Sequence, residues 1–340
     1  MGFHAWAPGR VNLIGEHTDY TGGLVCPMAI QLGIAIDGLP DDGVVRVSSA
    51  TEAGSVEFAL PISDPRSVRP TWGRYIAGVA ALLDEPRGFD ATITSTLPAG
   101  AGLSSSAALE VAAAMALGAA ADSTPTQIAA IAQAAEQQAT GMPCGIMDQM
   151  ASACGIAGHA LRIDCGTGEI TPVAVPDGAR IVVIHSGQSR RLVDSAYAER
   201  RHQCESAETV IGPLRHASLG DLDAVADDTT RRRAHHVISE NLRVDEFIGA
   251  LAGGDLAAAG DAMARSHVSL RDDFEVSTVV LDDLVEHLMA IDGVYGARLT
   301  GAGFGGCVVV LCRPDVTPIP SGLQGWLVEP SAGASITYED

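Results

Sequence analysis

The sequence predicts an α+β protein of about two domains, in which helices cover antiparallel sheets. The chain has 340 residues, a length typical of two domains. Hydrophobic residues make up 47% of the sequence and charged residues 19%, which is typical of a chain that folds around a core. Strand-like and helix-like segments occur in both halves. We expect the boundary between the domains near residue 175, which gives residues 1–175 and 176–340.

In the first half, short apolar runs separated by Gly, Asp and Pro predict strands and turns up to about residue 60. Residues 91–97 alternate and are rich in β-branched side chains, which predicts a further strand. A glycine-rich turn and an alanine-rich helix follow it. Thr124, Pro125 and Gln127 are typical of a helix start, and we expect this next helix to end near Gly141.

In the second half, residues 180–185 form an apolar run that predicts a strand. Residues 194–265 are rich first in Arg and Glu and then in Ala, which predicts helices. A helix over residues 281–289, a strand, a glycine-rich turn and a strand over residues 307–312 complete the expected order.

The charge composition excludes several classes of function. All 21 basic residues are arginine, and the absence of lysine excludes a lysine Schiff base, a Walker A loop and a Ser-x-x-Lys nucleophile pair. The formal net charge of −21 argues against nucleic acid or an anionic membrane surface as the main partner.

The amino-terminal residues and the cysteines indicate where the protein works. No apolar stretch is long enough to span a bilayer, and the first residues carry no signal-peptide pattern. The seven cysteines show no Cys-x-x-Cys spacing, which favours reduced, mostly buried thiols. We therefore expect a cytoplasmic protein without a membrane partner.

The segment from Ala7 to Gly23 concentrates ionisable and polar side chains between glycines. Carboxylates, imidazole and guanidinium groups hold hydroxyl-rich ligands because they donate and accept hydrogen bonds in fixed directions. A metal site made by Glu16, His17 and Asp19 is an alternative, but their adjacent spacing suits no common ligand pattern. For any one of these residues a solvated turn is also possible, although it explains the whole cluster poorly.

The segment from Leu97 to Glu110 reads as a strand, a glycine turn, three serines and a helix. Such a turn aims backbone N–H groups and hydroxyls at an anion on the helix N-terminus. About half of lone glycine turns are only turns, but the serine triplet sharpens the prediction. A dinucleotide-binding Rossmann site is excluded because no acidic residue ends a second strand about 20 residues later. A serine-hydrolase elbow is excluded because Gly-x-Ser-x-Gly is absent here.

The segment from Gly141 to Met150 places Asp148 among apolar residues. Taken alone, this aspartate is most simply a helix cap. Glu136 is less ordinary, because it falls on an apolar stripe of its predicted helix rather than opposite it. An ionised carboxylate on a core-facing stripe must be paired or bind a cation.

The later segment from Gly301 to Gly306 matches Gly-x-Gly-x-x-Gly, but a strand follows it, so we interpret it as a close-packing turn near the phosphates.

The three segments resemble the signature motifs of the GHMP kinases, a family of small-molecule kinases. Residues 9–20 resemble the galactokinase branch in particular, since the other branches lack this sugar-binding segment. The resemblance covers nearly the whole chain. It implies two lobes with the active site between them: an N-terminal domain similar to ribosomal protein S5 domain 2 and a ferredoxin-like C-terminal domain. It also implies ATP-dependent phosphorylation of D-galactose to galactose 1-phosphate.

The resemblance also implies site residues by motif. Asp148 would face the sugar O1 as base or charge partner, with Arg10 beside it. The sugar hydroxyls would be bound by Glu16, His17, Asp19, Gly145 and Tyr197. The nucleotide phosphates would be bound by Pro98, Gly100, Gly102, Leu103, Ser104, Ser105 and Ser106, and Trp72 would flank the adenine. Mg²⁺ would be held by Ser106 and Glu136. The expected partners are thus a sugar and ATP, and the expected assembly is a monomer or weak homodimer.

The chain departs from the family pattern in three ways. The first motif begins at Ala7, whereas a longer lead before this motif is common in the family. Ala302 stands where a glycine is usual, and several surface segments are short. Two alternatives therefore stay open. One is a kinase for another sugar, such as N-acetylgalactosamine, arabinose or a specialised-metabolite sugar. The other is a galactose sensor that binds its ligands without turnover, which is disfavoured by the presence of Arg10, Ser106, Ala107 and Asp148.

Overall fold

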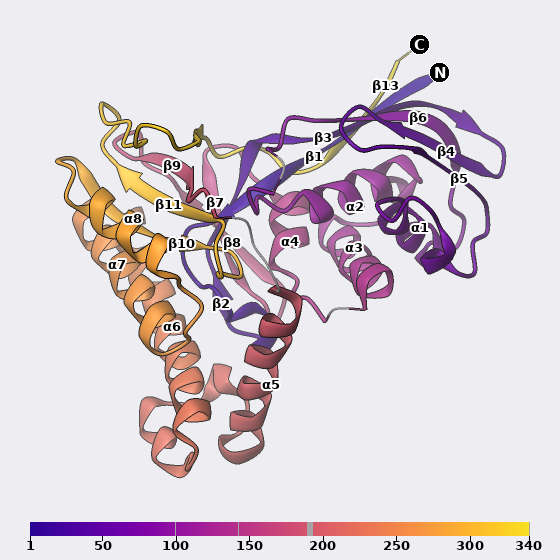
Figure 1. Cartoon of the computed structure of the whole chain (residues 1–340). Helices are drawn as coiled ribbons and strands as arrows, with labels where there is room; N and C mark the ends of the chain where they lie inside the picture. The colour runs from indigo at the N-terminus through magenta and orange to yellow at the C-terminus, as the bar shows by residue number, and fades with distance from the viewer. Residues whose placement is uncertain (99, 142, 189–192, 340) are drawn as a thin grey trace.

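The computed structural model describes residues 1–98, 100–141, 143–188 and 193–339. Two lobes, each with a sheet and covering helices, lie on either side of a small middle sheet (Figure 1). The predicted α+β class and two-lobed architecture are confirmed. Within these residues, no helix combines the length and the apolar character needed to cross a bilayer.

The first lobe contains a six-stranded sheet in the order β13-β1-β3-β6-β4-β5. Most neighbours are antiparallel, as expected, but β4 and β6 run parallel, so the prediction of purely antiparallel sheets is wrong for this pair. A parallel pair needs a long crossover, and the chain between these two strands supplies one that includes a helix. The strands are β1 (Gly2–Asn12), β3 (Pro27–Asp41), β4 (Val44–Ser49), β5 (Ser55–Ala59), β6 (Gly88–Ser95) and β13 (Ser335–Glu339).

Four helices cover one face of this sheet (Figure 1). They are α1 (Gly73–Leu82), α2 (Ser105–Ala116), α3 (Pro125–Thr140) and α4 (Met147–Cys154). α2 is buried along almost its whole length, and its many alanines let the sheet and neighbouring helices approach closely. The predicted start of α3 is confirmed: Thr124 and Gln127 form a capping box, and Gly141 ends the helix with φ of +78°.

The second lobe contains a four-stranded antiparallel sheet in the order β10-β11-β9-β12. The strands are β9 (Arg180–His185), β10 (Val294–Thr300), β11 (Cys307–Cys312) and β12 (Gly325–Val328), and the long helices are α5 (Val193–Ile211), α6 (Asp228–Ala252), α7 (Leu256–Asp272) and α8 (Val279–Met289). Every residue of β11 is buried, because apolar side chains cover both faces of this strand. The predicted strands over 180–185 and 307–312 are confirmed.

A three-stranded sheet lies between the two lobes. Its strands are β2 (Leu24–Val25), β7 (His159–Asp164) and β8 (Glu169–Ala174), in the order β2-β7-β8. The apolar cluster beside it joins residues of β1 and β3 with residues of β9 and β11. This one of the three apolar clusters therefore connects the lobes. The predicted division into residues 1–175 and 176–340 stays a prediction, and the last strand, β13, pairs with β1 in the first lobe.

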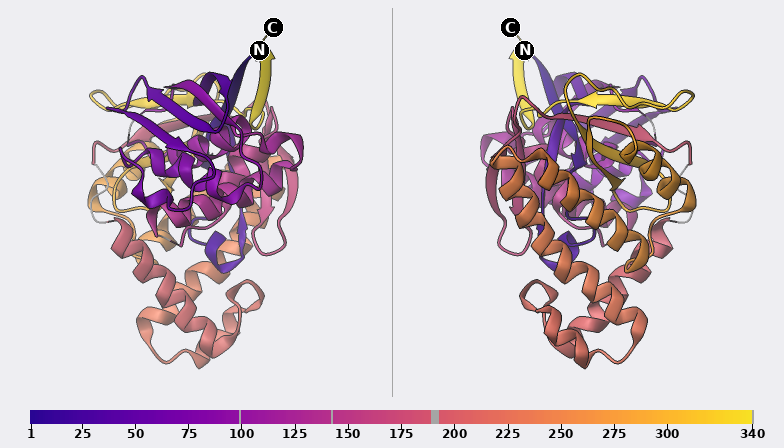
Figure 2. Two further views of the ribbon diagram at one scale, coloured as in Figure 1. Left: turned by 90° about the vertical axis from the view of Figure 1, so that its right-hand side faces the viewer. Right: turned by 90° about the vertical axis from the view of Figure 1, so that its left-hand side faces the viewer.

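α5 and the first turns of α6 project away from both sheets (Figures 1 and 2). Short 3₁₀ turns over Leu214–His216 and Leu219–Ala224 connect the two helices. With 25 residues, α6 is about 37 Å long. Its second half returns to the middle of the molecule, where it packs against β2 and the loop that follows β1. This loop carries the polar cluster of the first motif.

Candidate active site

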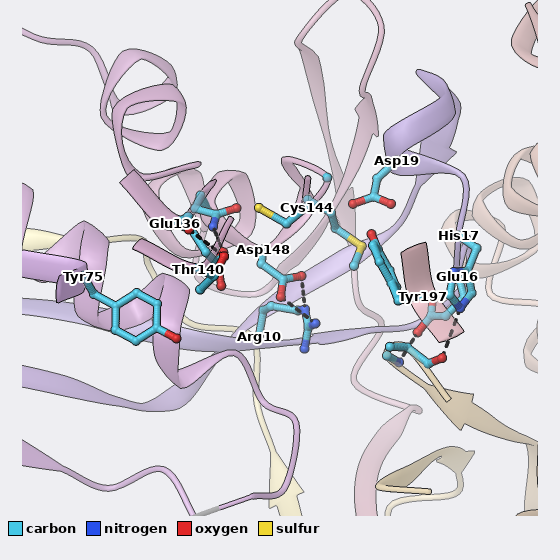
Figure 3. A pocket seen from close by; sticks show the side chains of 15 residues that line it. Arg10, Glu16, His17, Asp19, Tyr75, Glu136, Thr140, Cys144, Asp148 and Tyr197 are labelled. Atoms are coloured by element: carbon cyan, nitrogen blue, oxygen red, sulfur yellow. Dashed lines mark hydrogen bonds and ion pairs between the residues drawn. The ribbon is translucent and has the colours of Figure 1, made fainter. Parts of the chain in front are cut away.

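A cavity of about 330 Å³ lies where the lobes meet, a volume within the range of small-molecule sites. Figure 3 shows its lining side chains. They come from β1, the loop after β1, helices α1, α3, α4 and α5, the loop between α3 and α4, and the turn before β11: Arg10, Glu16, His17, Asp19, Tyr75, Glu136, Thr140, Cys144, Gly145, Met147, Asp148, Gln149, Tyr197, Gly301 and Ala302. Residues of the segment from Ala7 to Gly23 and of the segment from Gly141 to Met150 therefore line the same cavity.

A second cavity of about 390 Å³ is lined by the glycine–serine segment before α2. Its lining residues are Leu97, Pro98, Gly100, Gly102, Leu103, Ser104, Ser105 and Ser106, together with Arg10 and Asp148. Arg10 and Asp148 line both cavities. A ligand in one cavity and a ligand in the other would consequently meet at this pair.

Arg10 and Asp148 form a bidentate ion pair. Arg10 Nε donates to Asp148 Oδ1 at 2.7 Å, and Arg10 Nη2 donates to Asp148 Oδ2 at 2.8 Å. Arg10 Nη1 donates to the carbonyl oxygen of Gly102 at 2.9 Å, which fixes the guanidinium plane against the glycine–serine turn. The Ser104 hydroxyl also donates to Asp148 Oδ2. Two parallel charge-assisted hydrogen bonds hold the carboxylate in one orientation.

The N-terminus of α2 opens onto the second cavity. Gly100 and Gly102 both have φ of +71°, and Ser104, the residue before the helix, has φ of 61°. This left-handed conformation is costly for a residue with a Cβ and is concentrated at functional sites. The Ser104 side chain does not cap the helix, since it bonds to Asp148 instead. The first N–H groups of α2 thus remain directed toward the cavity, as in anion-binding helix ends.

Behind Asp148, side chains of three helices form a polar network. Ser106 Oγ of α2 donates to Glu136 Oε1 of α3 at 2.9 Å. Gln149 Nε2 of α4 donates to Glu136 Oε2 at 2.6 Å and to Glu110 Oε2 of α2 at 3.2 Å. Burial, followed by repulsion from Asp148, raises the pKa of Glu136. Burial, followed by repulsion from Glu136, raises the pKa of the fully buried Glu110 well above its usual range.

The opposite end of the first cavity holds the polar residues of the first motif (Figure 3). Glu16 is 2% exposed and accepts a hydrogen bond from the backbone N–H of Gly301 at 2.6 Å. Arg298, which is fully buried on β10, pairs with Glu16 at 3.3 Å. The Glu16 carboxylate therefore connects the loop after β1 to the second lobe through Gly301 and Arg298. The sequence motif alone does not reveal this role.

His17 is a neutral imidazole at this end of the cavity. Burial, followed by repulsion from His236, lowers the pKa of His17 to about 3. Its Nε2 lies 3.2 Å from the carbonyl oxygen of Ala302, and its Nδ1 lies 3.1 Å from the hydroxyl of Tyr20. The ring also packs against Tyr197 at a centroid distance of 5.6 Å. A neutral imidazole between these partners contributes hydrogen bonds to the cavity but no positive charge.

Asp19 and Gly145 are in direct contact. Burial, followed by repulsion from Asp148, raises the pKa of Asp19 to about 6. A Cβ added at Gly145 would lie 1.7 Å from Asp19 Oδ2, a distance that no real structure tolerates. The position therefore requires glycine because the carboxylate occupies the space of a side chain.

Gly145→Ala is expected to raise the KM for galactose, the sugar that the resemblance implies, by at least about tenfold, because the added methyl group must push the Asp19 carboxylate out of place. The KM for ATP, which the resemblance implies for the second cavity, should change less than twofold, since neither Gly145 nor Asp19 lines that cavity. Steady-state kinetics with each substrate varied in turn measures both constants. Gly249→Ala on α6 is a matched control, because nothing lies within 4 Å of its added Cβ and its backbone is helical. Equal galactose constants for wild type and Gly145→Ala would contradict the prediction.

The structure brings together the predicted catalytic, sugar, phosphate and metal residues, but the adenine prediction is not supported in the same way. Trp72 lines neither of the two cavities, and its Nε1 donates to the carbonyl oxygen of Ala53 at 3.3 Å. Tyr75, one turn further along α1, lines the first cavity instead, as do Thr140 and Cys144. None of these three was predicted as a site residue from the sequence. The only indication was that Tyr75 follows Trp72 by three residues, the spacing of one helical turn.

Ala99 and Met142, which belong to the segments 97–110 and 141–150, lie outside the described residues, as do residues 189–192, and the Asp194 side chain is also outside the description.

Family models match three parts of the chain. The galactokinase galactose-binding signature matches residues 2–37, the GHMP kinases N terminal domain matches residues 74–156, and the GHMP kinases C terminal model matches residues 247–318. The first includes Arg10 and the sugar motif, and the second includes the glycine–serine turn and Asp148.

Individual relatives agree with these matches. Galactokinase of Homo sapiens is 44% identical over 333 residues, which cover 92% of this chain and 84% of that protein. The crystal structure of Lactococcus lactis galactokinase complexed with galactose has a TM-score of 0.90 at 30% identity, and covers 98% of this chain and 95% of that one. Methanococcus jannaschii mevalonate kinase, at 18% identity and a TM-score of 0.67 over 96% of this chain and 98% of that one, shares the fold. The chain therefore belongs to the GHMP kinase family, in its galactokinase branch.

Proposed function

We propose that this chain transfers the γ-phosphoryl group of ATP to the anomeric hydroxyl of D-galactose, which yields galactose 1-phosphate and ADP. The observation that carries the proposal is that Arg10 and Asp148 line both cavities. A sugar in the first cavity and a triphosphate in the second would meet at one carboxylate. The galactose-binding signature over residues 2–37 and the galactokinase relatives support galactose as the acceptor.

In this proposal, Asp148 orients the acceptor. Its carboxylate accepts a hydrogen bond from the anomeric O1–H and takes the proton as the new P–O bond forms and the bond to the ADP oxygen breaks. The bidentate contact with Arg10 holds the carboxylate in place and keeps one positive charge beside the reacting oxygens. Sugar hydroxyls are bound at the other end of the cavity by Glu16, His17, Asp19, Gly145 and Tyr197.

The nucleotide phosphates occupy the second cavity. Phosphoryl transfer depends mainly on positioning and charge neutralisation, and this chain has no lysine for the purpose. We assign the phosphates to the N–H groups of the first turn of α2 and to the residues from Pro98 to Ser106 that the structure describes. Trp72 is retained as a candidate adenine neighbour, with Tyr75 as the residue that lines the cavity.

Ser106 and Glu136 are proposed to hold Mg²⁺. The residues fit the ion: Glu136 accepts hydrogen bonds from Ser106 and Gln149, which are both neutral, and burial opposes its charge. Among the described residues no group of three His, Cys, Asp or Glu side chains gathers as a metal site. Mg²⁺ needs only one or two protein ligands in such a site, because nucleotide enzymes bind the ion largely through the substrate phosphates. When bound, the ion supplies positive charge to the phosphate oxygens.

The compartment and assembly are also proposals. All seven cysteines are free thiols, which fits the reducing cytoplasm. A monomer or weak homodimer remains the predicted assembly.

A sugar panel tests the function. Release of ADP is measured with galactose, N-acetylgalactosamine and arabinose as acceptors, and NMR couplings between phosphorus and the sugar identify the phosphorylated position. We expect turnover with galactose and a phosphate on C1. Turnover with one of the other sugars alone would replace the substrate, and tight binding of galactose and ATP without ADP release would make the protein a sensor.

A further inference from the structure

Glu110 is a buried carboxyl group that the proposed chemistry does not use. It lies on α2 with no exposed surface, one helical turn after Ser106, so both side chains point from the same face of the helix. Its Oε2 accepts from Gln149 Nε2 at 3.2 Å. A carboxyl group at this depth is costly unless it makes specific hydrogen bonds.

Gln149 connects this group to the proposed metal ligand. Its Nε2 donates to Glu110 Oε2 and, at 2.6 Å, to Glu136 Oε2. Glu136 Oε1 faces Ser106 Oγ at 2.9 Å. One oxygen of Glu136 thus belongs to the Ser106 side, and the other is held by Gln149. Removal of the Gln149 contact would leave the Glu136 carboxylate held only by Ser106 and Cys144, and therefore less constrained in its rotation.

The free atoms of the network indicate how Glu110 and Gln149 fit together. Among the described residues, Glu110 Oε1 and Gln149 Oε1 have no hydrogen-bond partner, although both are buried. Burial, followed by repulsion from Glu136, raises the pKa of Glu110 well above its usual range, which favours the neutral form. A carboxylic acid has one O–H to donate, and a side-chain amide oxygen is an acceptor. A neutral Glu110 would thus bring one donor to the network, while its Oε2 accepts from Gln149 Nε2.

We propose that Glu110, acting through Gln149, is a positioning residue that holds the Glu136 carboxylate in the orientation required for the divalent cation. α2 then supplies both a proposed ligand, Ser106, and the support for the second ligand, while α3 and α4 supply Glu136 and Gln149. This inference rests on the proposed function, in which Ser106 and Glu136 bind Mg²⁺. Such outer contacts commonly change metal affinity by about 10–100-fold.

Two substitutions at one position separate positioning from mere packing. Glu110→Gln keeps an oxygen that can accept from Gln149 Nε2, so we expect metal affinity within about twofold of wild type. Glu110→Leu keeps a similar volume but cannot make this hydrogen bond. We expect metal affinity to fall by about tenfold or more. Leucine removes one acceptor of Gln149 Nε2, but this nitrogen keeps its hydrogen bond to Glu136, so the thermal midpoint should fall only modestly.

The readout is binding, not turnover. Mn²⁺ replaces Mg²⁺, and electron paramagnetic resonance measures free Mn²⁺ in the presence of galactose and the β,γ-imido analogue of ATP. Galactose affinity, measured by calorimetry, should be equal in wild type and both Glu110 variants, because Glu110 lines neither cavity. The proposal is overturned if Glu110→Leu binds Mn²⁺ like wild type, or if Glu110→Gln loses as much affinity as Glu110→Leu. Glu136→Gln is measured in parallel: unchanged Mn²⁺ affinity there would refute the metal site itself, and with it this inference.

Discussion

Asp148→Asn is expected to lower kcat by about 10³-fold, the largest effect of any single substitution in the cleft. Asparagine has nearly the same size, but its amide is neutral, does not accept the proton of the acceptor hydroxyl, and directs N–H groups at the Arg10 guanidinium. The bidentate pair with Nε and Nη2 of Arg10 is lost at the same time. Nucleotide affinity should be retained, because the N-terminus of α2 and the glycine–serine segment are unchanged.

The measurements are kcat from ADP release and nucleotide affinity from calorimetry. Asp245→Asn is a matched control, since Asp245 also pairs with an arginine, Arg162, at 2.9 Å but is 56% exposed and lines neither cavity. Its kcat should stay within twofold of wild type. A kcat for Asp148→Asn within tenfold of wild type would remove this carboxylate from the proposed chemistry.

Glu240→Gln is expected to destabilise the fold by about 3–5 kcal/mol, the largest stability effect that we predict. Glu240 is fully buried on α6 and accepts from the Gly15 N–H at 3.0 Å, Ser266 Oγ at 2.5 Å and Arg243 Nε at 2.7 Å. The amide would leave Arg243, which is 8% exposed, without its counter-charge. Because Gly15 belongs to the sugar motif, the galactose KM should rise more than the ATP KM.

Denaturant unfolding at several pH values measures this effect. Burial alone would raise the pKa of Glu240, but Arg243, then His236 and Arg298, lower it from 4.5 to about 2. A lowered carboxyl pKa stabilises the folded state above the unfolded pKa, and this stability is lost as pH falls through the folded pKa. The difference between wild type and Glu240→Gln should accordingly shrink between pH 4.5 and about 2.

The control for this variant is Glu246→Gln on the same helix. Glu246 pairs with Arg265 at 2.8 Å, but both side chains are about half exposed. An exposed pair contributes little, so we expect a change of less than about 1 kcal/mol. Equal losses of stability in the two variants would mean that burial of the Glu240 pair is unimportant.

The sequence was sufficient to predict the elements that bear the motifs. The strand, glycine turn and serines before α2 follow from local backbone chemistry, and the cap at Thr124 follows from side-chain hydrogen bonding within four residues. Glu136 was noticed because a carboxylate on an apolar stripe conflicts with the helical pattern, and the structure gives it hydrogen-bond partners from two other helices. The roles of these residues stay proposals.

Other parts of the site depend on contacts between distant segments, which local patterns do not encode. Arg298 reaches Glu16 across 282 positions, and Glu240 reaches Gly15 across 225. On α6, a glutamate among arginines and histidines is typical of a solvated face, and only the packing of the second lobe shows it to be buried. The parallel pairing of β4 with β6 has the same origin, because pairing partners are chosen by the whole sheet.

The antiparallel pairing of β13 with β1 has a consequence for attempts to dissect the protein. Gly2 is opposite Glu339 and Trp6 is opposite Ser335, so the last strand covers one side of the first. A fragment that stopped at residue 175 would leave that side of β1 with bare amide and carbonyl groups, which invite other chains to add strands and aggregate. The sheet of the first lobe is thus completed by residues 335–339, which follow the second lobe in the chain, so this sheet gains its β13 edge only after the second lobe has been synthesised.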